Sequence, residues 1–316
     1  MKGWQFVGTN QPLKLVEQPD PKAVPGKVVI DVKAAGLCHS DVGVLRDPGW
    51  LVMMTVPVIM GHEIAGVISE VGEGVTDFKV GDRVAVCPTG PSGAGAPGYS
   101  YDGGFGTKVL APAADLAHIP DNVTFAQAAA STDAGMTSYH AAFVKGGIKE
   151  GMTVGMIGIG GLGMIALEAA VNIGAKVYAA DTSANARELA KKLGAAGVVS
   201  DCKELAQFEP EVIVDFAGFD VTTREALKAV AFQGKVVLVG MGVLTTTIEV
   251  TPMILKQTTL VGSNGGTLQD VIDVNKLISE GKINPVITTI TFDQIPEGIK
   301  LLEDNKVTGR LVALYD

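Results

Sequence analysis

The sequence predicts an α/β fold in which a β-rich domain accompanies a doubly wound, parallel sheet of six strands. Two observations lead to this class. Up to about residue 130, short apolar runs are separated by turn residues, whereas the later part alternates apolar runs with helix-like segments. Glycine makes up 40 of the 316 residues, about 13% where ~7% is usual, and this excess indicates many tight turns.

The N-terminal part has the pattern of an irregular, mostly antiparallel β-domain. Its apolar runs are rich in valine, and pairs such as Pro25-Gly26 and Gly81-Asp82 punctuate them, as expected between short strands. The predicted strands are Lys27–Ala34, Glu63–Val71, Arg83–Val86 and Thr107–Leu110.

From about residue 129, six buried strands alternate with helix-like stretches. Their starts lie about 14 to 24 residues apart, the spacing expected when each parallel strand returns through a helix. Six such strands predict a doubly wound sheet. They are Val154–Ile157, Val177–Ala180, Val198–Val199, Val212–Phe216, Val236–Val239 and Thr259–Val261.

The C-terminal tail is too short for a third domain, so we expect it to pack back on the first one. It holds two predicted helices, Leu268–Glu280 and Ile295–Asn305, and two predicted strands, Val286–Phe292 and Leu311–Leu314. The expected organisation is one domain of residues 1–134 and 265–316 and a second of residues 135–264.

Charge and cysteine content exclude several function classes. The net charge is −9 without any Lys/Arg block, so nothing favours nucleic acid or an anionic membrane as a partner. The three cysteines, Cys38, Cys87 and Cys202, argue against a disulfide framework and for a reducing compartment. The uncharged stretch 151–167 contains six glycines, which suits a strand, turn and helix better than a bilayer span. We therefore expect a cytoplasmic protein.

A glycine-rich turn, Gly-Ile-Gly-Gly-Leu-Gly, matches G-x-G-x-x-G between a predicted strand and a predicted helix. Gly158 allows the tight turn, Gly160 lets the backbone approach a pyrophosphate, and Gly163 permits close helix–strand packing. With Gly161 and Leu162 they open a helix whose free N–H groups attract phosphate. A plain glycine-rich turn is the alternative interpretation.

An acidic residue strengthens the dinucleotide interpretation. Asp181 ends the next predicted strand, 18 residues after Gly163. A carboxylate there accepts hydrogen bonds from the adenosine ribose and repels a 2′-phosphate. Although Arg187 lies one turn on, no arginine is adjacent to Asp181, and the sequence predicts NAD(H) rather than NADP(H).

Three segments contain candidate metal ligands: Gly-Leu-Cys38-His-Ser-Asp, Gly-His62-Glu, and Asp133 with its neighbours. Spacing alone gives a weak signal, because 24 residues separate Cys38 from His62 and 71 separate His62 from Asp133. A small buried thiol, a satisfied core histidine and a helix-capping aspartate are the ordinary alternatives.

Taken together and in order, these segments resemble those of the medium-chain zinc-dependent alcohol dehydrogenases. The chain also has their Val-Gly-Asp-Arg-Val run (80–84) and their late Gly-Lys-Ile and Gly-Arg segments (281–283 and 309–310). The resemblance implies a GroES-like, β-rich catalytic domain into which a Rossmann NAD-binding domain is inserted.

The resemblance also implies roles for individual residues. Cys38, His62 and Asp133 would hold a catalytic Zn²⁺, with Asp133 where the family's commonest ligand is cysteine, and three protein ligands would leave one position open. Glu63 would approach the metal during ligand exchange, and Asp41 would anchor the far nitrogen of His62.

Ser40 would accept the proton of the alcohol. Family members often carry a histidine three residues further on that passes the proton outward, but here that position is Gly43, so the exit route stays open between water and His39. His39 would otherwise lie near the cofactor pyrophosphate. Arg310 would be a second phosphate contact, and Thr137 would pack beside the nicotinamide.

A lobe with four cysteines and a second, structural zinc is typical of the family. In this chain a Gly/Pro loop without metal-ligating side chains, residues 88–98, follows Cys87 instead. The sequence therefore predicts one zinc per chain.

The predicted activity is hydride transfer between NAD(H) and a medium-sized apolar alcohol, ketone or aldehyde. Trp50, Leu51, Met53 and Met54 would contribute to the substrate cleft, although core packing or a subunit contact is an equal alternative for them. The resemblance implies a homodimer or homotetramer, with 259–263 as a candidate contact.

Two other functions stay open. The first is reduction of a conjugated C=C bond on the same scaffold, as in zinc-free relatives, against which Cys38 and His62 argue. The second is a non-catalytic NAD-binding structural protein, against which the retained ligands and Ser40 argue.

Overall fold

The computed structural model describes all residues, 1–316, and the chain divides into two compact units. Unit 1 comprises Met1–Met136, Thr267–Gly281 and Pro285–Asp316, and unit 2 comprises Thr137–Gly266 with Lys282–Asn284. No helix in either unit is long and apolar enough to span a bilayer.

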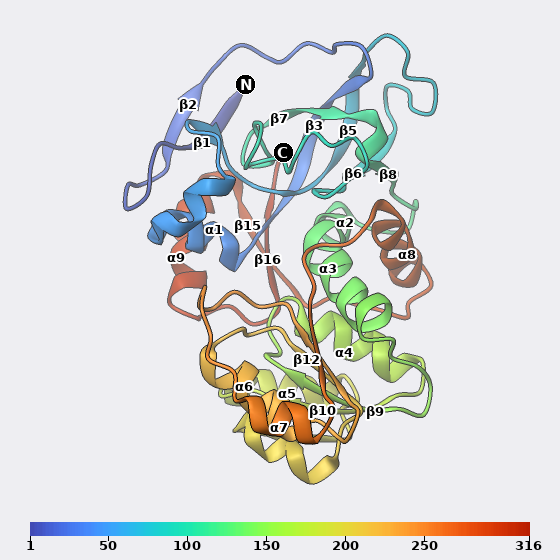
Figure 1. Cartoon of the computed structure of the whole chain (residues 1–316). Helices are drawn as coiled ribbons and strands as arrows, with labels where there is room; N and C mark the ends of the chain where they lie inside the picture. The colour runs from blue at the N-terminus through green and yellow to red at the C-terminus, as the bar shows by residue number, and fades with distance from the viewer. The chain divides into compact units, whose positions relative to one another are not determined.

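Unit 1 is built on two sheets (Figure 1). The smaller has the order β2-β1-β4, and the larger has the order β15-β16-β3-β5-β6-β8, with β7 pairing to β3. The strands are β1 (Lys2–Phe6), β2 (Lys14–Glu17), β3 (Lys27–Leu37), β4 (Val58–Ile59), β5 (Glu63–Val71), β6 (Arg83–Val86), β7 (Lys108–Pro112), β8 (Leu116–His118), β15 (Ile287–Thr291) and β16 (Arg310–Leu314).

The C-terminal strand β16 pairs antiparallel with β3, so the last residues of the chain complete the larger sheet of unit 1. Fully buried side chains such as Phe6, Ile30, Ile64 and Phe105 form the core beneath it. The helical elements of this unit are α1 (His39–Arg46), η1 (Pro48–Met53), η2 (Ala113–Asp115), α2 (Phe125–Ala130), η3 (Ser131–Gly135), α8 (Leu268–Ser279), η6 (Phe292–Gln294) and α9 (Ile295–Glu303).

Unit 2 is a parallel six-stranded sheet of order β11-β10-β9-β12-β13-β14. Starting from β9, this is the doubly wound order 3-2-1-4-5-6, which confirms the predicted fold class. The strands are β9 (Thr153–Ile157), β10 (Lys176–Ala180), β11 (Gly197–Val199), β12 (Val212–Asp215), β13 (Lys235–Leu238) and β14 (Thr259–Gly262).

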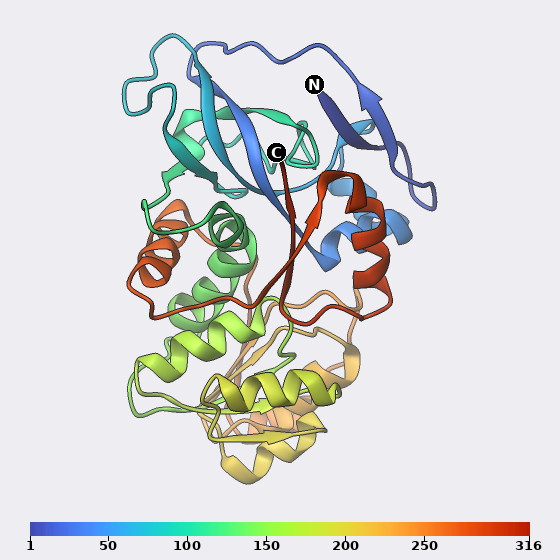
Figure 2. The same ribbon diagram turned by 180° about the vertical axis from the view of Figure 1, so that it is seen from behind.

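Helices cover both faces of this sheet. Figures 1 and 2, which view the chain from opposite sides, show α6 and α7 before one face and α4 and α5 before the other. The helical elements are α3 (Met136–Tyr139), η4 (His140–Lys145), α4 (Gly163–Asn172), α5 (Ala184–Lys192), η5 (Cys202–Phe208), α6 (Asp220–Ala229) and α7 (Val250–Leu255).

Candidate functional site

Three candidate metal ligands from distant parts of unit 1 meet in the structure. Cys38 caps helix α1, His62 directly precedes β5, and Asp133 lies on η3. Asp133 Oδ2 is 3.7 Å from Cys38 Sγ and 3.3 Å from His62 Nε2. One ligand atom from each of the three lies within 4.8 Å of the others.

This donor set fits a zinc ion. With zinc–ligand bonds of ~2.0 to 2.3 Å, tetrahedral geometry places nitrogen and oxygen about 3.3 Å apart and sulfur and oxygen about 3.5 Å apart, close to the separations found. The electrostatics agree with this fit. Burial alone would lower the pKa of His62, but the effect of the nearby Asp41, together with Tyr99 and Asp133, is larger. The pKa of His62 is therefore raised well above its ordinary value. The cluster therefore favours a cation.

A π-helical turn positions Asp133. Helix α2 begins with a capping box, in which Thr124 Oγ1 accepts from Gln127 N, and its last turn widens into the π-helical η3. The amide of Ala134 donates to Glu63 Oε1 at 2.9 Å, outside the helical ladder. Glu63 thereby holds the backbone beside Asp133.

Glu63 is also one half of a buried ion pair. Arg310 Nε donates to Glu63 Oε2 at 2.9 Å, and Arg310 Nη2 donates to Glu63 Oε1 at 2.5 Å, with exposed fractions of 3% and 0% for the two side chains. Burial raises the pKa of Glu63, and the Arg310 charge opposes that rise. Arg310 Nη2 also lies 3.7 Å from Asp133 Oδ2. The structure thus places Arg310 against the ligand cluster, and its predicted phosphate contact stays a prediction.

Asp41 connects the helix start to His62. Its Oδ2 accepts from Cys38 N at 2.9 Å, and its Oδ1 lies 3.4 Å from His62 Nδ1. Both of these atoms, Asp41 Oδ1 and His62 Nδ1, are buried, and neither makes a hydrogen bond. Asp41 thus faces His62, and its predicted hydrogen bond to Nδ1 stays a prediction.

Ser40 and His39 lie in the first turn of α1, where His39 is exposed and Ser40 is half-buried. Tyr99, which the sequence interpretation missed, lies beside them. Its ring meets His62 edge-on at 5.5 Å between centroids. No spacing rule connects position 99 to positions 40 and 62.

The three key glycines in the glycine turn of unit 2 have three different surroundings. Gly158 has φ +85°, a backbone conformation that side chains rarely adopt. A Cβ at Gly163 would lie 1.9 Å from Gly158 O, whereas a Cβ at Gly160 would meet no atom within 4 Å. Gly163 is thus fixed by packing, and Gly160 borders open space that a phosphate can occupy. Gly161 and Leu162 follow and are half-buried, and Leu162 caps α4.

Asp181 follows β10 and faces this turn. Its Oδ2 accepts from Ile159 N at 2.7 Å, and its Oδ1 accepts from Ser183 N at 2.8 Å. Arg187 donates to the carbonyls of Asp181 and Thr182. The carboxylate is fixed at the strand end where a ribose is expected.

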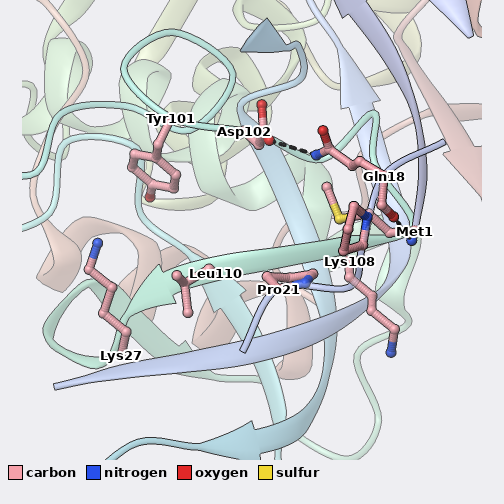
Figure 3. A pocket seen from close by; sticks show the side chains of 9 residues that line it. Met1, Gln18, Pro21, Lys27, Tyr101, Asp102, Lys108 and Leu110 are labelled. Carbon is pink, nitrogen blue, oxygen red and sulfur yellow. Dashed lines mark hydrogen bonds between the residues drawn. The ribbon is translucent and has the colours of Figure 1, made fainter. Parts of the chain in front are cut away.

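One cavity of about 230 Å³ in unit 1 lies apart from the metal cluster (Figure 3). Two of its charged groups already have partners, since the Met1 amine is paired with Asp20 and Lys108 is paired with Asp31. None of the three metal ligands lines it. The lining residues are Met1, Gln18, Pro19, Pro21, Lys27, Tyr101, Asp102, Lys108 and Leu110.

Comparison with known proteins gives the family. Residues 24–121 match the model of the alcohol dehydrogenase GroES-like domain, and residues 161–280 match that of the zinc-binding dehydrogenases. An alcohol dehydrogenase of Geobacillus stearothermophilus is 34% identical, over 97% of this chain and 97% of the relative. The chain belongs to the medium-chain zinc-type alcohol dehydrogenase family.

Solved structures agree with this assignment. The acetophenone reductase from Geotrichum candidum, in complex with NAD, is 30% identical, with a TM-score of 0.91 over 99% of this chain and 96% of that one. The alcohol dehydrogenase of Aeropyrum pernix is 26% identical, with a TM-score of 0.92 over 99% and 100%. Among the relatives found by sequence, an acryloyl-coenzyme A reductase of Sulfurisphaera tokodaii is 31% identical over 99% of both chains. The chain is therefore an oxidoreductase with the family's GroES-like and Rossmann domains, as predicted.

Proposed function

We propose that this family member transfers hydride between NAD(H) and a medium-sized apolar alcohol and its ketone or aldehyde, using one zinc per chain. The proposal is carried by the cluster of Cys38, His62 and Asp133, whose atom separations suit tetrahedral zinc. Residues 1–134 with 265–316 supply the catalytic domain, and residues 135–264 supply the NAD-binding domain. The Geobacillus relatives that carry the name alcohol dehydrogenase support this activity.

When bound, zinc supplies a Lewis acid that lowers the pKa of a bound hydroxyl and polarises a carbonyl, and NAD(H) accepts or gives the hydride. Asp41, whose Oδ1 lies 3.4 Å from Nδ1 of His62, would hold the ring so that Nε2 faces Asp133. Ser40 takes the proton that the alcohol loses. Arg310 holds Glu63 in its buried position, and Glu63 is then available for exchange at the metal.

In the second domain, the backbone around Gly160 receives the pyrophosphate, and Asp181 accepts hydrogen bonds from the adenosine ribose. His39 and Thr137 complete the proposed cofactor contacts. For the substrate, the η1 segment supports an apolar compound, because Leu51 and Met53 expose 38% and 44% of their surface beside the buried Trp50.

The test is NADH oxidation with a panel of apolar ketones and aldehydes, together with elemental analysis of the purified protein. We expect turnover, one zinc per chain, and loss of turnover after chelation that added zinc restores. Two zincs per chain, or full turnover by metal-free protein, would contradict the proposal.

A second activity, reduction of a conjugated C=C bond, is favoured by the acryloyl-coenzyme A reductase relative. Enones and an acryloyl thioester in the same assay separate the two. Product analysis then shows whether the carbonyl or the C=C bond was reduced, and the zinc-dependent proposal requires the carbonyl.

We also propose a homodimer or homotetramer that uses residues 250–263 of unit 2. Val250, Ile254 and Leu255 expose 62%, 65% and 71% of their surface, and β14 is an edge strand. Light scattering on the wild type and on Leu255→Glu tests this contact. We expect the wild type to have the mass of an oligomer and Leu255→Glu to have a lower mass. The same mass in the two proteins would speak against this contact.

A further inference from the structure

Helix α8 lies beside α2, whose continuation η3 carries the metal ligand Asp133 (Figures 1 and 2). Two neighbouring residues of α8 meet the two ends of this π-helical turn. Asn275 Oδ1 is 3.1 Å from Ser131 Oγ, and a Cβ at Gly135 would lie only 2.8 Å from Val274 Cγ1. Helix α8 therefore contacts η3 at its first and its last residue.

Asp133 lies midway between these two contacts. Successive residues of a helix are about 100° apart around its axis, so residues two positions apart lie on nearly opposite sides. Ser131 and Gly135 face α8, whereas Asp133 Oδ2 is 3.7 Å from Cys38 Sγ and 3.3 Å from His62 Nε2. One side of the turn is thus held by α8, while the opposite side presents the ligand.

The Ser131 hydroxyl stands where α2 changes into the wider turn. Its Oγ lies 2.7 Å from Ala128 O, three residues back, as well as 3.1 Å from Asn275 Oδ1. A serine hydroxyl that bonds to a carbonyl in the preceding turn competes with the regular helical ladder. That ladder is displaced here, because Met136 N donates to Ser131 O, five residues back, as in a π-helix. Asn275 therefore fixes the hydroxyl at the first residue of the displaced ladder.

Stability alone does not explain an asparagine at position 275. The side chain is 1% exposed, and its Nδ2 is buried without a hydrogen-bond partner. A buried N–H group without a partner costs free energy of folding, whereas a leucine would bury only apolar surface at this place. What the asparagine supplies in return is its bond to Ser131.

We propose that Asn275 is a positioning residue for the metal site: through Ser131 it fixes the π-helical turn that presents Asp133 to the other two ligands. This inference rests on the proposed function, in which Cys38, His62 and Asp133 hold zinc. Asn275 acts through η3 and is not itself a ligand.

The test compares Asn275→Leu with Asn122→Leu. Asn122 is a matched control because it also bonds to a serine of α8: its Nδ2 donates to Ser279 O at 2.8 Å, and its Oδ1 accepts from Ser279 Oγ at 2.7 Å. It precedes α2 and lies outside η3. For Asn275→Leu we expect the zinc Kd, measured by competition with a chelator, to rise about tenfold, the lower end of the range for groups that support metal ligands. Asn122→Leu should keep the wild-type Kd.

Urea denaturation of the zinc-free proteins separates positioning from a merely structural role. Asn275→Leu removes the unpartnered Nδ2, and Ser131 keeps Ala128 O as its acceptor. The urea midpoint should therefore not fall below that of the wild type. An unchanged zinc Kd in Asn275→Leu, an equal rise in Asn122→Leu, or a lower urea midpoint beside the weaker zinc binding would each overturn the inference.

A crystal structure of zinc-free Asn275→Leu separates this inference from the proposed function. In the variant, Met136 N should bond to Thr132 O, four residues back, and Asp133 should move away from the other two ligands. A π-helical turn that is kept in the variant would refute the role of Asn275, whether or not the protein binds zinc. A wild type that binds no zinc would instead contradict the proposed function, while the structure of the variant still decides whether Asn275 fixes the turn.

Discussion

The glycine turn of unit 2 takes its functional backbone from six consecutive residues, whereas the metal cluster of unit 1 takes Cys38, His62 and Asp133 from three separate elements. In the turn, Gly158 is required by its own φ angle and Gly163 by the nearest backbone, while Gly160 borders open space. In the cluster, the ligands are held by second residues, namely Asp41, Glu63 and Arg310. A contiguous site depends on local geometry, and a dispersed one depends on buried partners, so mutations should damage the two in different ways.

The largest effect should come from the dispersed site. Asp133→Ala leaves only Cys38 and His62 as ligands, so we expect bound zinc and turnover to be lost together. Elemental analysis and the ketone assay measure this, with the exposed Asp121→Ala as the control that keeps both. An Asp133→Ala protein that retains one zinc per chain would show that the ligand set is wrong.

The next effect concerns the partners of the cluster. Arg310→Gln leaves the Glu63 carboxylate buried without its counter-charge, and breaking a buried pair in this way costs about 3–5 kcal/mol of stability. Urea denaturation of the zinc-loaded protein should show it. The exposed pair Arg46–Glu303 provides the control, since Arg46→Gln should shift the midpoint little. Equal shifts for the two variants would mean that the buried pair is not needed.

The contiguous glycine turn and the dispersed metal cluster also differ in how far the sequence predicts them. The parallel strands, the glycine turn and Asp181 were all predictable, because each depends on residues close together in the chain. The π-helical turn at Asp133 was not, since one extra residue in a helical turn barely alters the apolar pattern of Phe125–Ala130. The Glu63–Arg310 pair joins positions 247 residues apart, and no spacing argument reaches that far.

The contacts around α1 were unpredictable for a related reason. That Trp50 fills the space over Gly43 depends on how η1 folds back on α1, and that the Tyr99 ring contacts His62 depends on the course of the loop after Cys87. The sequence shows that Gly43 departs from the family pattern, but the reason, the Trp50 ring that fills this space, is visible only in three dimensions.

A smaller effect separates packing from ligand space in the glycine turn. Gly163→Ala would place a Cβ 1.9 Å from Gly158 O, so we expect a loss of about 1–3 kcal/mol, as for overpacking, and a lower Tm. Gly160→Ala meets no protein atom within 4 Å, so its Tm should stay unchanged while the Kd for NADH rises about tenfold. Thermal melting and NADH fluorescence titration measure the two, and a Gly160→Ala protein with normal NADH affinity would exclude the pyrophosphate from this position.

The smallest effect concerns the choice of cofactor. Asp181→Asn keeps the size of the side chain and removes the charge that repels a 2′-phosphate, so the kcat/KM ratio of NADP to NAD should rise about tenfold, or ~1.4 kcal/mol. Asp201→Asn is the matched control, because Asp201 also follows a strand of the same sheet and accepts from a backbone amide two residues on, at Lys203. The ratio should stay at the wild-type value in that variant. A wild type that prefers NADP, or an Asp181→Asn ratio equal to that of Asp201→Asn, would mean that the carboxylate beside the glycine turn does not select the cofactor.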